Sequence, residues 1–311
     1  MKALVTGGAG FIGSNLALEL VERGHDVRVL DDLYLGTVEN LEPARDEIDF
    51  MEGDVRDRDT VRQACRDVDV VFHDAARSSA PMHKEDPVEG ADVNVLGFIN
   101  VMEEARNGDV DRVVYASTSS MYGSVDPPHS ENMGEKPVNL YSASKMSREL
   151  YAEVYHTLYD VDVVGLRYFS VYGPRERSKG RFANLVSQFM WKMMDGERPE
   201  IWGDGSRTRD FTYVKDIVRG NILAAESGVS GEVINLGTGE ETRMDELVDK
   251  LNRELGTDID PEFVENPQEY PVERTKADSS KAEKLLGWEP EVDIDEGIHR
   301  TAEFYRGEED A

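Results

Sequence analysis

A glycine-rich stretch at residues 2–14 constrains the fold of this chain more than any other part of the sequence. It begins with a short apolar run, residues 3–5, of the kind that forms a buried parallel strand. Gly7, Gly10 and Gly13 follow at three-residue spacing, and apolar residues then recur at helical period as far as Leu20. The pattern predicts a strand, a tight glycine turn and a helix.

The three glycines indicate a phosphate-binding turn. Glycine can take the positive φ that a tight turn requires, and a turn without side chains lets a pyrophosphate approach the backbone. Free N–H groups at the start of the helix then hold the phosphates. Asp31 and Asp32 follow a second predicted strand, about twenty residues later, where a carboxylate can bind the adenosine ribose. A carboxylate there would repel a 2′-phosphate, so the sequence favours NAD over NADP.

Short apolar strands alternate with helical patterns through the first half of the chain. The longest of these helices is expected at residues 86–106, and the loop at residues 74–77 is small and polar, so it can approach a cofactor. Such alternation indicates an α/β fold, a Rossmann-type doubly wound parallel sheet whose ligands bind beyond the carboxyl ends of the strands. After the first strand, we expect strands at residues 25–30, 48–52, 68–73 and 112–116.

The charge balance excludes several classes of partner. The chain carries 64 acidic residues against 35 basic ones, for a formal net charge of -29. Such a field repels nucleic acid and anionic membranes, so we expect neither as a partner. The acidity suggests a high-salt cytoplasm, where a Debye length of about 3 Å near 1 M salt damps the self-repulsion. An ordinary acidic protein is the alternative.

Several features of the sequence point to the cytoplasm. Cys65 is the only cysteine, so no internal disulfide is possible, as is usual in a reducing compartment. No apolar run is long enough to span a membrane, and Met1 leads into the first predicted strand too soon for a signal peptide. We expect no metal, because the sequence has no histidine and cysteine cluster, and we expect His73 to be a core residue.

A tyrosine and a lysine in the middle of the chain form a candidate catalytic pair. Tyr141 and Lys145 stand four residues apart in a predicted helix, and side chains at that spacing are neighbours on one face. A phenol with a pKa near 10 is a poor base at neutral pH, but a nearby ammonium and a positive nicotinamide ring could lower that pKa. Hydroxyl side chains at residues 117–120 would face the reacting end of the cofactor. A solvated pair on a helix surface is the alternative.

Together these motifs resemble the extended short-chain dehydrogenase/reductase family, and within it the nucleotide-sugar epimerases of the UDP-glucose 4-epimerase type. The similarity spans nearly the whole chain. It rests on TGGAGFIGS at residues 6–14, MYG at 121–123, YSASK at 141–145, LRYFSVYGPR at 166–175, GDGSRTRDFTYVKD at 203–216 and ADSSKAEKLLGWE at 277–289.

The resemblance implies a domain organisation and an assembly. Residues 1–170 would form an NAD-binding Rossmann domain to which residues 214–236 return. Residues 171–213 and 237–311 would form a smaller, discontinuous domain that binds the nucleotide sugar. The helices around residues 94–106 and 141–159 resemble those of a four-helix interface in the family, so a homodimer is expected.

The resemblance also implies roles for single residues. Tyr141 matches the catalytic base, and Lys145 matches the residue that holds the nicotinamide ribose and tunes that tyrosine. Thr118 matches the residue that hydrogen-bonds the sugar 4-hydroxyl, with its serine neighbours as alternatives. The other NAD-contacting positions are Gly7, Gly10, Phe11, Ile12, Gly13, Asp31, Asp32, Asp54, Val55, Ala75, Ala76, Asn94, Ser117 and Tyr168.

The implied substrate site lies mainly in the second half of the chain. Arg209 stands where the family places a phosphate-binding arginine; pairing with Asp210 or Asp216 is the alternative. Gln268 and Tyr270 replace an arginine and a glycine of many relatives, and Arg274 could compensate. Thr275 aligns with a position whose bulk gates an N-acetyl group at C2, and a threonine should admit it. The substrate-binding residues that the resemblance implies are Arg77, Thr118, Ser119, Ser120, Tyr141, Ser170, Asn184, Leu185, Arg209, Arg274 and Thr275.

The reaction that the resemblance implies is inversion of C4 of a UDP-hexose by transient oxidation to a 4-keto sugar. Dehydratases and decarboxylases of the family carry an acidic residue in the loop before the Tyr-Gly pair, whereas residues 118–121 contain none. Two alternatives remain. One is a nucleotide-sugar 4,6-dehydratase or 4-keto-sugar reductase, and the other is an NAD-binding regulatory protein without activity.

Overall fold

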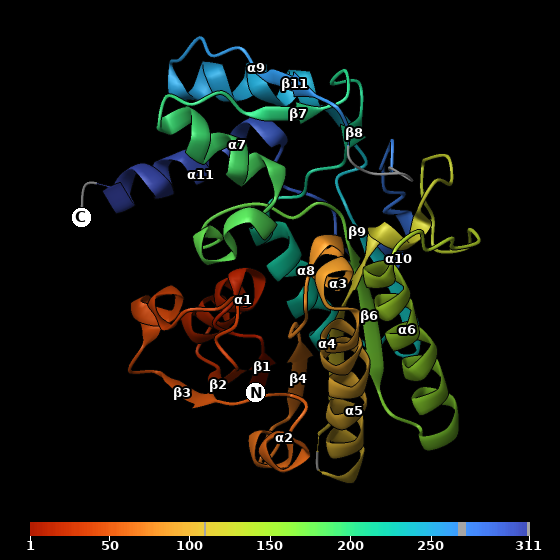
Figure 1. Ribbon diagram of the computed structural model, residues 1–311. Coiled ribbons are helices and arrows are strands. Elements are labelled where there is room, and N and C mark those ends of the chain that lie inside the picture. Colours follow the sequence, from red (N-terminus) through yellow and green to blue (C-terminus); the bar gives the residue numbers. More distant parts are fainter. Residues whose placement is uncertain (109, 267–271, 310–311) are drawn as a thin grey trace.

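A computed structural model describes residues 1–108, 110–266 and 272–309 and has one large parallel sheet at its centre. Its seven strands follow the order β3-β2-β1-β4-β5-β6-β9, and every neighbouring pair is parallel (Figure 1). The order reverses beside β1, which places a ligand crevice at the carboxyl ends of β1 and β4. The strands are β1 (Lys2–Thr6), β2 (Asp26–Asp31), β3 (Ile48–Glu52), β4 (Val70–His73), β5 (Arg112–Thr118), β6 (Val163–Tyr168) and β9 (Glu232–Leu236).

Helices cover both faces of the sheet, as the alternating pattern predicts. Val5 belongs to the buried cluster that holds Leu16 of α1 (Phe11–Glu22) and Val218 of α8 (Val214–Glu226). Its neighbour Leu4 belongs to the opposite cluster, with residues of α2 (Arg58–Ala64), α5 (Gly97–Asn107) and α6 (Leu140–Tyr159). Consecutive side chains of a strand point to opposite faces, so a strand buried on both sides reads as a continuous apolar run.

The helix expected at residues 86–106 is present, with a π turn inside it. It runs without a gap through α4 (Pro87–Ala91), the π-helical turn η2 (Asp92–Leu96) and α5. A π turn inserts an extra residue into the helix and commonly occurs at functional sites. This one contains Asn94, which is fully buried and hydrogen-bonded to the loop after β4. Apolar periodicity does not reveal such an insertion.

Short elements complete the connections between strands. The carboxyl-terminal loops of β2, β4 and β5 lead into η1 (Val38–Ala44), α3 (Ala80–Glu85) and η3 (Ser119–Tyr122) respectively. The segment expected to return to the large sheet contributes α8 and β9, and β9 pairs with β6 from Val164 to Tyr168. Within the described part of the chain, no helix is long and apolar enough to cross a membrane.

A smaller lobe lies beyond the carboxyl edge of the sheet, in the upper part of Figure 1. Two small sheets belong to it, a parallel pair of β7 and β11 and an antiparallel pair of β8 and β10. Its elements are η4 (Arg177–Phe182), α7 (Leu185–Met194), β7 (Glu200–Trp202), β8 (Thr208–Arg209), β10 (Thr242–Arg243), α9 (Met244–Leu255), β11 (Glu262–Val264) and α11 (Ile294–Glu309). Helix α10 (Ser280–Leu286) packs instead on β9 and α8 of the large sheet.

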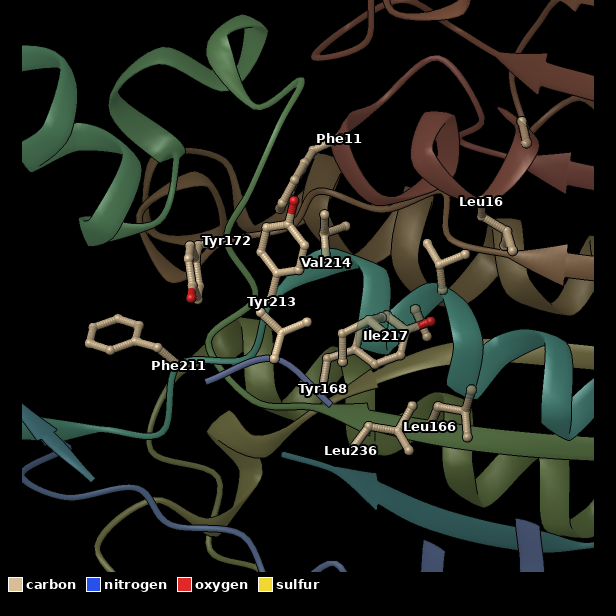
Figure 2. Close-up of a cluster of buried hydrophobic side chains, with 14 of the residues drawn as sticks. Phe11, Leu16, Leu166, Tyr168, Tyr172, Phe211, Tyr213, Val214, Ile217 and Leu236 are labelled. Atoms are coloured by element: carbon tan, nitrogen blue, oxygen red, sulfur yellow. The ribbon is translucent and has the colours of Figure 1, made fainter. Parts of the chain in front are cut away.

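An aromatic cluster and a buried carboxylate join the two lobes. Figure 2 shows Tyr172, Phe211 and Tyr213 in one buried cluster with Leu166 and Leu236 of the large sheet. The Tyr172 ring lies 5.8 Å from the Tyr213 ring and 6.3 Å from the Phe211 ring.

The buried carboxylate is that of Asp210, which is fully buried and accepts hydrogen bonds from backbone N–H groups of three separate positions. These are Thr238 at 2.8 Å, Gly239 at 2.9 Å and Ala277 at 2.9 Å. The smaller lobe is therefore fixed to the end of β9.

Candidate active site

The glycine turn forms a cradle that only bare backbone can supply. Gly7 has φ of 70°, and a Cβ atom on it would lie 2.7 Å from the backbone nitrogen of Ala75. A Cβ atom on Gly13 would overlap the carbonyl oxygen of Gly7. Gly10 is the N-cap of α1, and neither a side-chain cap nor an acidic residue occupies the first turn of that helix. The helix N-terminus therefore suits a pyrophosphate group.

A cavity of about 330 Å³ extends from this turn along the carboxyl edge of the sheet. It reaches from Asp32 after β2 to Tyr141 and Lys145 of α6. The sequence-predicted residues that line it are Gly7, Gly10, Phe11, Ile12, Gly13, Asp31, Asp32, Val55, Ala75, Ala76, Arg77, Ser117, Thr118, Ser119, Ser120, Tyr141, Lys145, Tyr168, Ser170 and Asn184.

Two carboxylates mark the adenosine end of the cavity. Asp31 is buried, and its oxygens accept hydrogen bonds from the N–H groups of Ala9 at 2.9 Å and Leu33 at 2.8 Å. Burial raises the pKa of Asp31, although the two backbone donors oppose that shift. A dinucleotide whose pyrophosphate lies on α1 would bring its ribose to these carboxylates, so the residues present fit NAD.

The catalytic pair lies at the start of α6, where a capping box fixes the helix end. The Asn139 side chain accepts a hydrogen bond from the N–H of Ser142 at 2.9 Å. One turn into the helix, the Lys145 ammonium donates to the carbonyl oxygen of Ala116 at 3.0 Å. Thr118, the last residue of β5, lies close enough to Tyr141 for its hydroxyl to lower the pKa of that tyrosine. Strand β5 and helix α6 therefore bring all three predicted catalytic residues together.

Burial dominates the pKa of Tyr141 in the protein without cofactor. It raises this pKa, and the Thr118 hydroxyl and the Arg148 guanidinium oppose that shift. Burial and the positive charge of Arg148 also hold the pKa of Lys145 well below its usual value. A tyrosinate at this site therefore needs a further positive charge, which the oxidised nicotinamide ring of a bound cofactor supplies.

The hydroxyl groups at residues 117–120 have different partners. The Ser117 hydroxyl donates to Glu149 at 2.5 Å, and Glu149 is paired with Arg167 at 2.7 Å. Ser117 thus lines the cavity while its hydroxyl joins a buried ion pair. Ser119 and Ser120 line the same wall, and the N–H of Ser120 donates to the Thr118 oxygen at 3.2 Å. Thr118 is the hydroxyl that reaches Tyr141.

Asp74 is a cavity-lining residue to which the sequence reasoning assigned no role. The Tyr168 hydroxyl can donate to Asn221 Oδ1 at 3.0 Å or to Asp74 Oδ1 at 3.3 Å, while the Asn221 amide donates to the carbonyl oxygen of Ile217. The other Asp74 oxygen is buried and has no hydrogen-bond partner among the described residues. Burial raises the pKa of Asp74 to about 6. An acidic residue directly after a buried strand was the available sequence signal.

Arg148 and Asn94 hold the loop after β4 in place. The Arg148 guanidinium donates to the carbonyl oxygens of Asn94 at 2.6 Å and Ala75 at 2.8 Å. The Asn94 amide accepts from the N–H of Arg77 at 2.8 Å and donates to its carbonyl at 3.2 Å. Asn94 thus acts on the cavity through the backbone of residues 75–77 and does not line the cavity. The sequence did not single out Arg148, which stands one turn beyond Lys145.

Asp54, predicted to contact NAD, and Arg77, predicted to contact substrate, both form ion pairs at the adenosine end of the cavity. Asp54 does not line the cavity in the described structure, because Arg56 binds its carboxylate at 2.6 Å. Arg77, expected to contact substrate, contacts Asp32 at 3.1 Å and lies 3.7 Å from the centre of the Tyr34 ring. These contacts belong to the adenosine end of the cavity.

The predicted residues of the substrate lobe lie apart from this cavity, except Asn184. Asn184 lines it and caps α7, whose first residue is Leu185. Arg274 is paired with Glu241 at 2.7 Å, and the Thr275 hydroxyl accepts from the N–H of Asp210 at 3.1 Å. Gln268 and Tyr270 lie outside the described residues.

Arg209 is bound to backbone and not to either of the aspartates considered as partners. Its guanidinium donates to the carbonyl oxygens of Thr208 at 2.7 Å and Val272 at 2.9 Å. Burial and the nearby Arg207 lower the pKa of Arg209 to about 10. Two guanidinium groups close together in a protein interior favour an anionic ligand.

Known proteins share this architecture over the whole chain. A model of the NAD dependent epimerase/dehydratase family matches residues 3–237. A putative UDP-glucose 4-epimerase of Methanocaldococcus jannaschii is 40% identical over 306 residues, 97% of this chain and 98% of that protein. The UDP-glucose 4-epimerase of Thermotoga maritima, solved with UDP-glucose, superposes with a TM-score of 0.94 at 35% identity and 99% coverage of both chains. A dTDP-glucose 4,6-dehydratase of Streptomyces venezuelae, solved with NAD, has a TM-score of 0.92 at 32% identity, covering 99% of this chain and 97% of that one.

Replacing Asp74 with Asn should change how stability depends on pH. The pKa of Asp74 is about 6 in the folded protein against an ordinary value of 3.8, so the folded state binds this proton more tightly. The wild type therefore loses stability as the pH rises from about 4 to about 6, and Asp74→Asn does not. Above about pH 6 the variant should be more stable by up to about 3 kcal/mol.

Thermal unfolding followed by circular dichroism at about pH 4 and about pH 8, with saturating NAD, measures this difference. A gap between wild type and Asp74→Asn that is the same at both pH values would contradict the assignment.

Proposed function

Because the chain belongs to the NAD dependent epimerase/dehydratase family, we propose that it inverts C4 of a UDP-hexose, interconverting UDP-glucose and UDP-galactose. The observation that carries this proposal is the meeting of Thr118, Tyr141 and Lys145 in the cavity that begins at the glycine turn. That arrangement places a hydroxyl-binding group, a base and a cation beside the reacting end of the cofactor cleft. It suits oxidation of a secondary alcohol and reduction of the resulting ketone.

NAD is the family's cofactor, and when bound it accepts a hydride from C4 and returns it. The residues of this chain hold it by three means. The turn at Gly7 and Gly10 would bind the pyrophosphate, Asp31 would bind the adenosine ribose, and Lys145 would bind the nicotinamide ribose. Since no net oxidation occurs, the cofactor is not consumed.

The proton step belongs to Tyr141 and Thr118. Thr118 holds the sugar 4-hydroxyl against Tyr141, and the tyrosinate removes the hydroxyl proton as the C4 hydrogen leaves. The keto sugar then turns its other face to the cofactor, and Tyr141 returns the proton to the oxygen. Burial raises the pKa of Tyr141 in the protein alone, and a positive nicotinamide ring beside it would lower that pKa.

The cavity favours epimerisation over loss of water. A dehydratase needs a further acid and base near C5 and C6, yet no carboxylate occupies the loop at residues 118–121. In the described structure the carboxylates that line the cavity are Asp31 and Asp32 at the adenosine end and Asp74, which contacts Tyr168. The similarity to a 4,6-dehydratase keeps that reaction as the second candidate.

The substrate lobe would bind the nucleotide diphosphate. The buried guanidinium of Arg209, with Arg207 near it, supports a role in binding the phosphate oxygens. We assign the C2 gate to Thr275 and expect the N-acetyl sugars to be accepted. An NAD-binding protein without activity would have no need for a complete catalytic set.

We also infer that the enzyme is a homodimer built on α5 and α6, which lie side by side. Helix α6 exposes a row of apolar side chains to solvent, among them Leu150, Val154 and Leu158, the last 66% exposed. A monomer rarely presents so long an apolar stripe, and a second copy of the same helix pair would cover it.

A salt-rich cytoplasm is the environment that we propose. The single cysteine, Cys65, is buried and free, and the net charge of -29 destabilises a compact chain unless ions screen it.

Proton NMR of the anomeric signals tests the reaction directly. Wild-type enzyme with NAD in ~2 M KCl should convert UDP-galactose and UDP-glucose to the same mixture, while Tyr141→Phe should lose activity by at least about a hundredfold. Tyr141→Phe keeps the ring and removes the proton-transferring oxygen. Unchanged spectra for both sugars, or a 4-keto-6-deoxy product, would contradict the epimerase proposal.

The same assay with the N-acetyl sugars tests Thr275. Thr275→Tyr should abolish conversion of the N-acetyl substrates and spare UDP-glucose. Equal loss on both kinds of substrate would contradict the gate.

Sedimentation velocity tests the dimer and the salt requirement. Wild type in ~2 M KCl should sediment as a dimer and Leu158→Asp as a folded monomer; identical behaviour of the two would contradict the α5–α6 interface.

Without added KCl the compact species should be lost, and a compact dimer in dilute buffer would contradict the salt proposal.

A further inference from the structure

Arg77 is a buried cation at the cofactor cleft. It follows β4, lines the cavity, and is 5% exposed. The Asn94 side chain binds both the N–H and the carbonyl oxygen of Arg77, which fixes the backbone of this residue. The position of the guanidinium is therefore set by the fold and is not left to a flexible surface chain.

The contacts of the guanidinium come from two other segments of the chain. One Nη atom donates to Asp32 after β2 at 3.1 Å and to Glu89 of α4 at 2.7 Å. The ring of Tyr34 lies across the guanidinium, 3.7 Å from the ring centre to the central carbon. A planar guanidinium stacked on an aromatic ring is a favourable arrangement. Tyr34 and Arg77 thus link the loop after β2 to the loop after β4.

The link continues to the third neighbouring strand. Glu89 also pairs with Arg56 at 2.5 Å, and Arg56 pairs with Asp54 at 2.6 Å in the loop after β3. Alternating charges therefore connect the carboxyl ends of three strands at the adenosine end of the cavity. Buried and half-buried pairs of this kind are screened less by salt than exposed ones.

The Nε donor of Arg77 is unused. The Nε–H is buried and has no hydrogen-bond partner among the described residues, whereas Asp32 and Glu89 both accept from one Nη atom. A buried donor without an acceptor is costly to the folded state, and its presence beside a cleft points to a ligand oxygen. The cleft at this end is the part that takes the adenosine half of the cofactor.

We propose that Arg77 binds NAD, with its Nε–H donating to an oxygen of the adenosine half and its stack with Tyr34 closing the cleft over that half. Arg77 then acts on cofactor retention and not on the sugar. Retention matters because a cofactor that leaves in its reduced form stops the catalytic cycle. The proposal rests on the cofactor alone, so it stands or fails independently of the sugar substrate.

The test is the rate at which the holoenzyme releases NAD. Protein loaded with radiolabelled NAD is chased with excess unlabelled NAD, and the label that stays with the protein is followed by rapid gel filtration. Arg77→Gln should release NAD about tenfold faster or more, because a buried hydrogen bond from a charged group is lost. Tyr34→Ala should also accelerate release, whereas Tyr34→Phe keeps the ring and should match the wild type.

Two further variants serve as controls for the Arg77→Gln result. Arg77→Lys retains the charge without the Nε donor, so release at the wild-type rate would show that charge alone suffices and would overturn the donor role. Arg45→Gln removes an exposed arginine that lies over Phe50 away from the cavity, and it should leave release unchanged.

Tyr34 is 55% exposed, so its variants should fold even if Arg77→Gln does not. Release at the wild-type rate from both Arg77→Gln and Tyr34→Ala would overturn the proposal.

Discussion

The close contact between Gly7 and Ala75 is the constraint on which the rest of the site depends. No side chain fits between the glycine turn and the loop after β4, since a Cβ atom on Gly7 would lie 2.7 Å from Ala75. The two loops meet at the point where the strand order reverses, so the cavity begins there. Arg148 and Asn94 hold the Ala75 loop from the other side. Phosphate binding, ribose binding and catalysis all take their positions from this contact.

Several ionisable side chains are buried around the catalytic groups, which is energetically unfavourable. Lys145 and Arg148 are both buried near the nicotinamide end, and burial lowers the pKa of each. Asp74 lies near them, with its pKa raised to about 6 by the same burial. Such a set is unfavourable in an interior unless partners compensate it. An oxidised, positively charged cofactor completes the balance by favouring the tyrosinate form of Tyr141.

Much of the fold could be predicted from the sequence because its signals are local. The glycine spacing, the apolar strands and the Tyr141–Lys145 spacing each follow from the geometry of one element, and the structure places these residues in one cavity. The π turn at η2, the Arg77–Tyr34 stack and the link from Tyr168 to Asp74 depend on contacts between distant segments. Periodicity carries no information on such contacts. The rise of the Tyr141 pKa in the protein without cofactor is of the same kind, since burial is a property of the whole fold.

The fate of the hydrogen at C4 tests the central claim most directly. UDP-glucose deuterated at C4 is incubated with the holoenzyme, and the product is examined by deuterium and proton NMR. The account predicts UDP-galactose with the deuterium still at C4, because the cofactor stays bound and returns the same hydride to the other face. Deuterium at C6, in free NADH or in the solvent would contradict it.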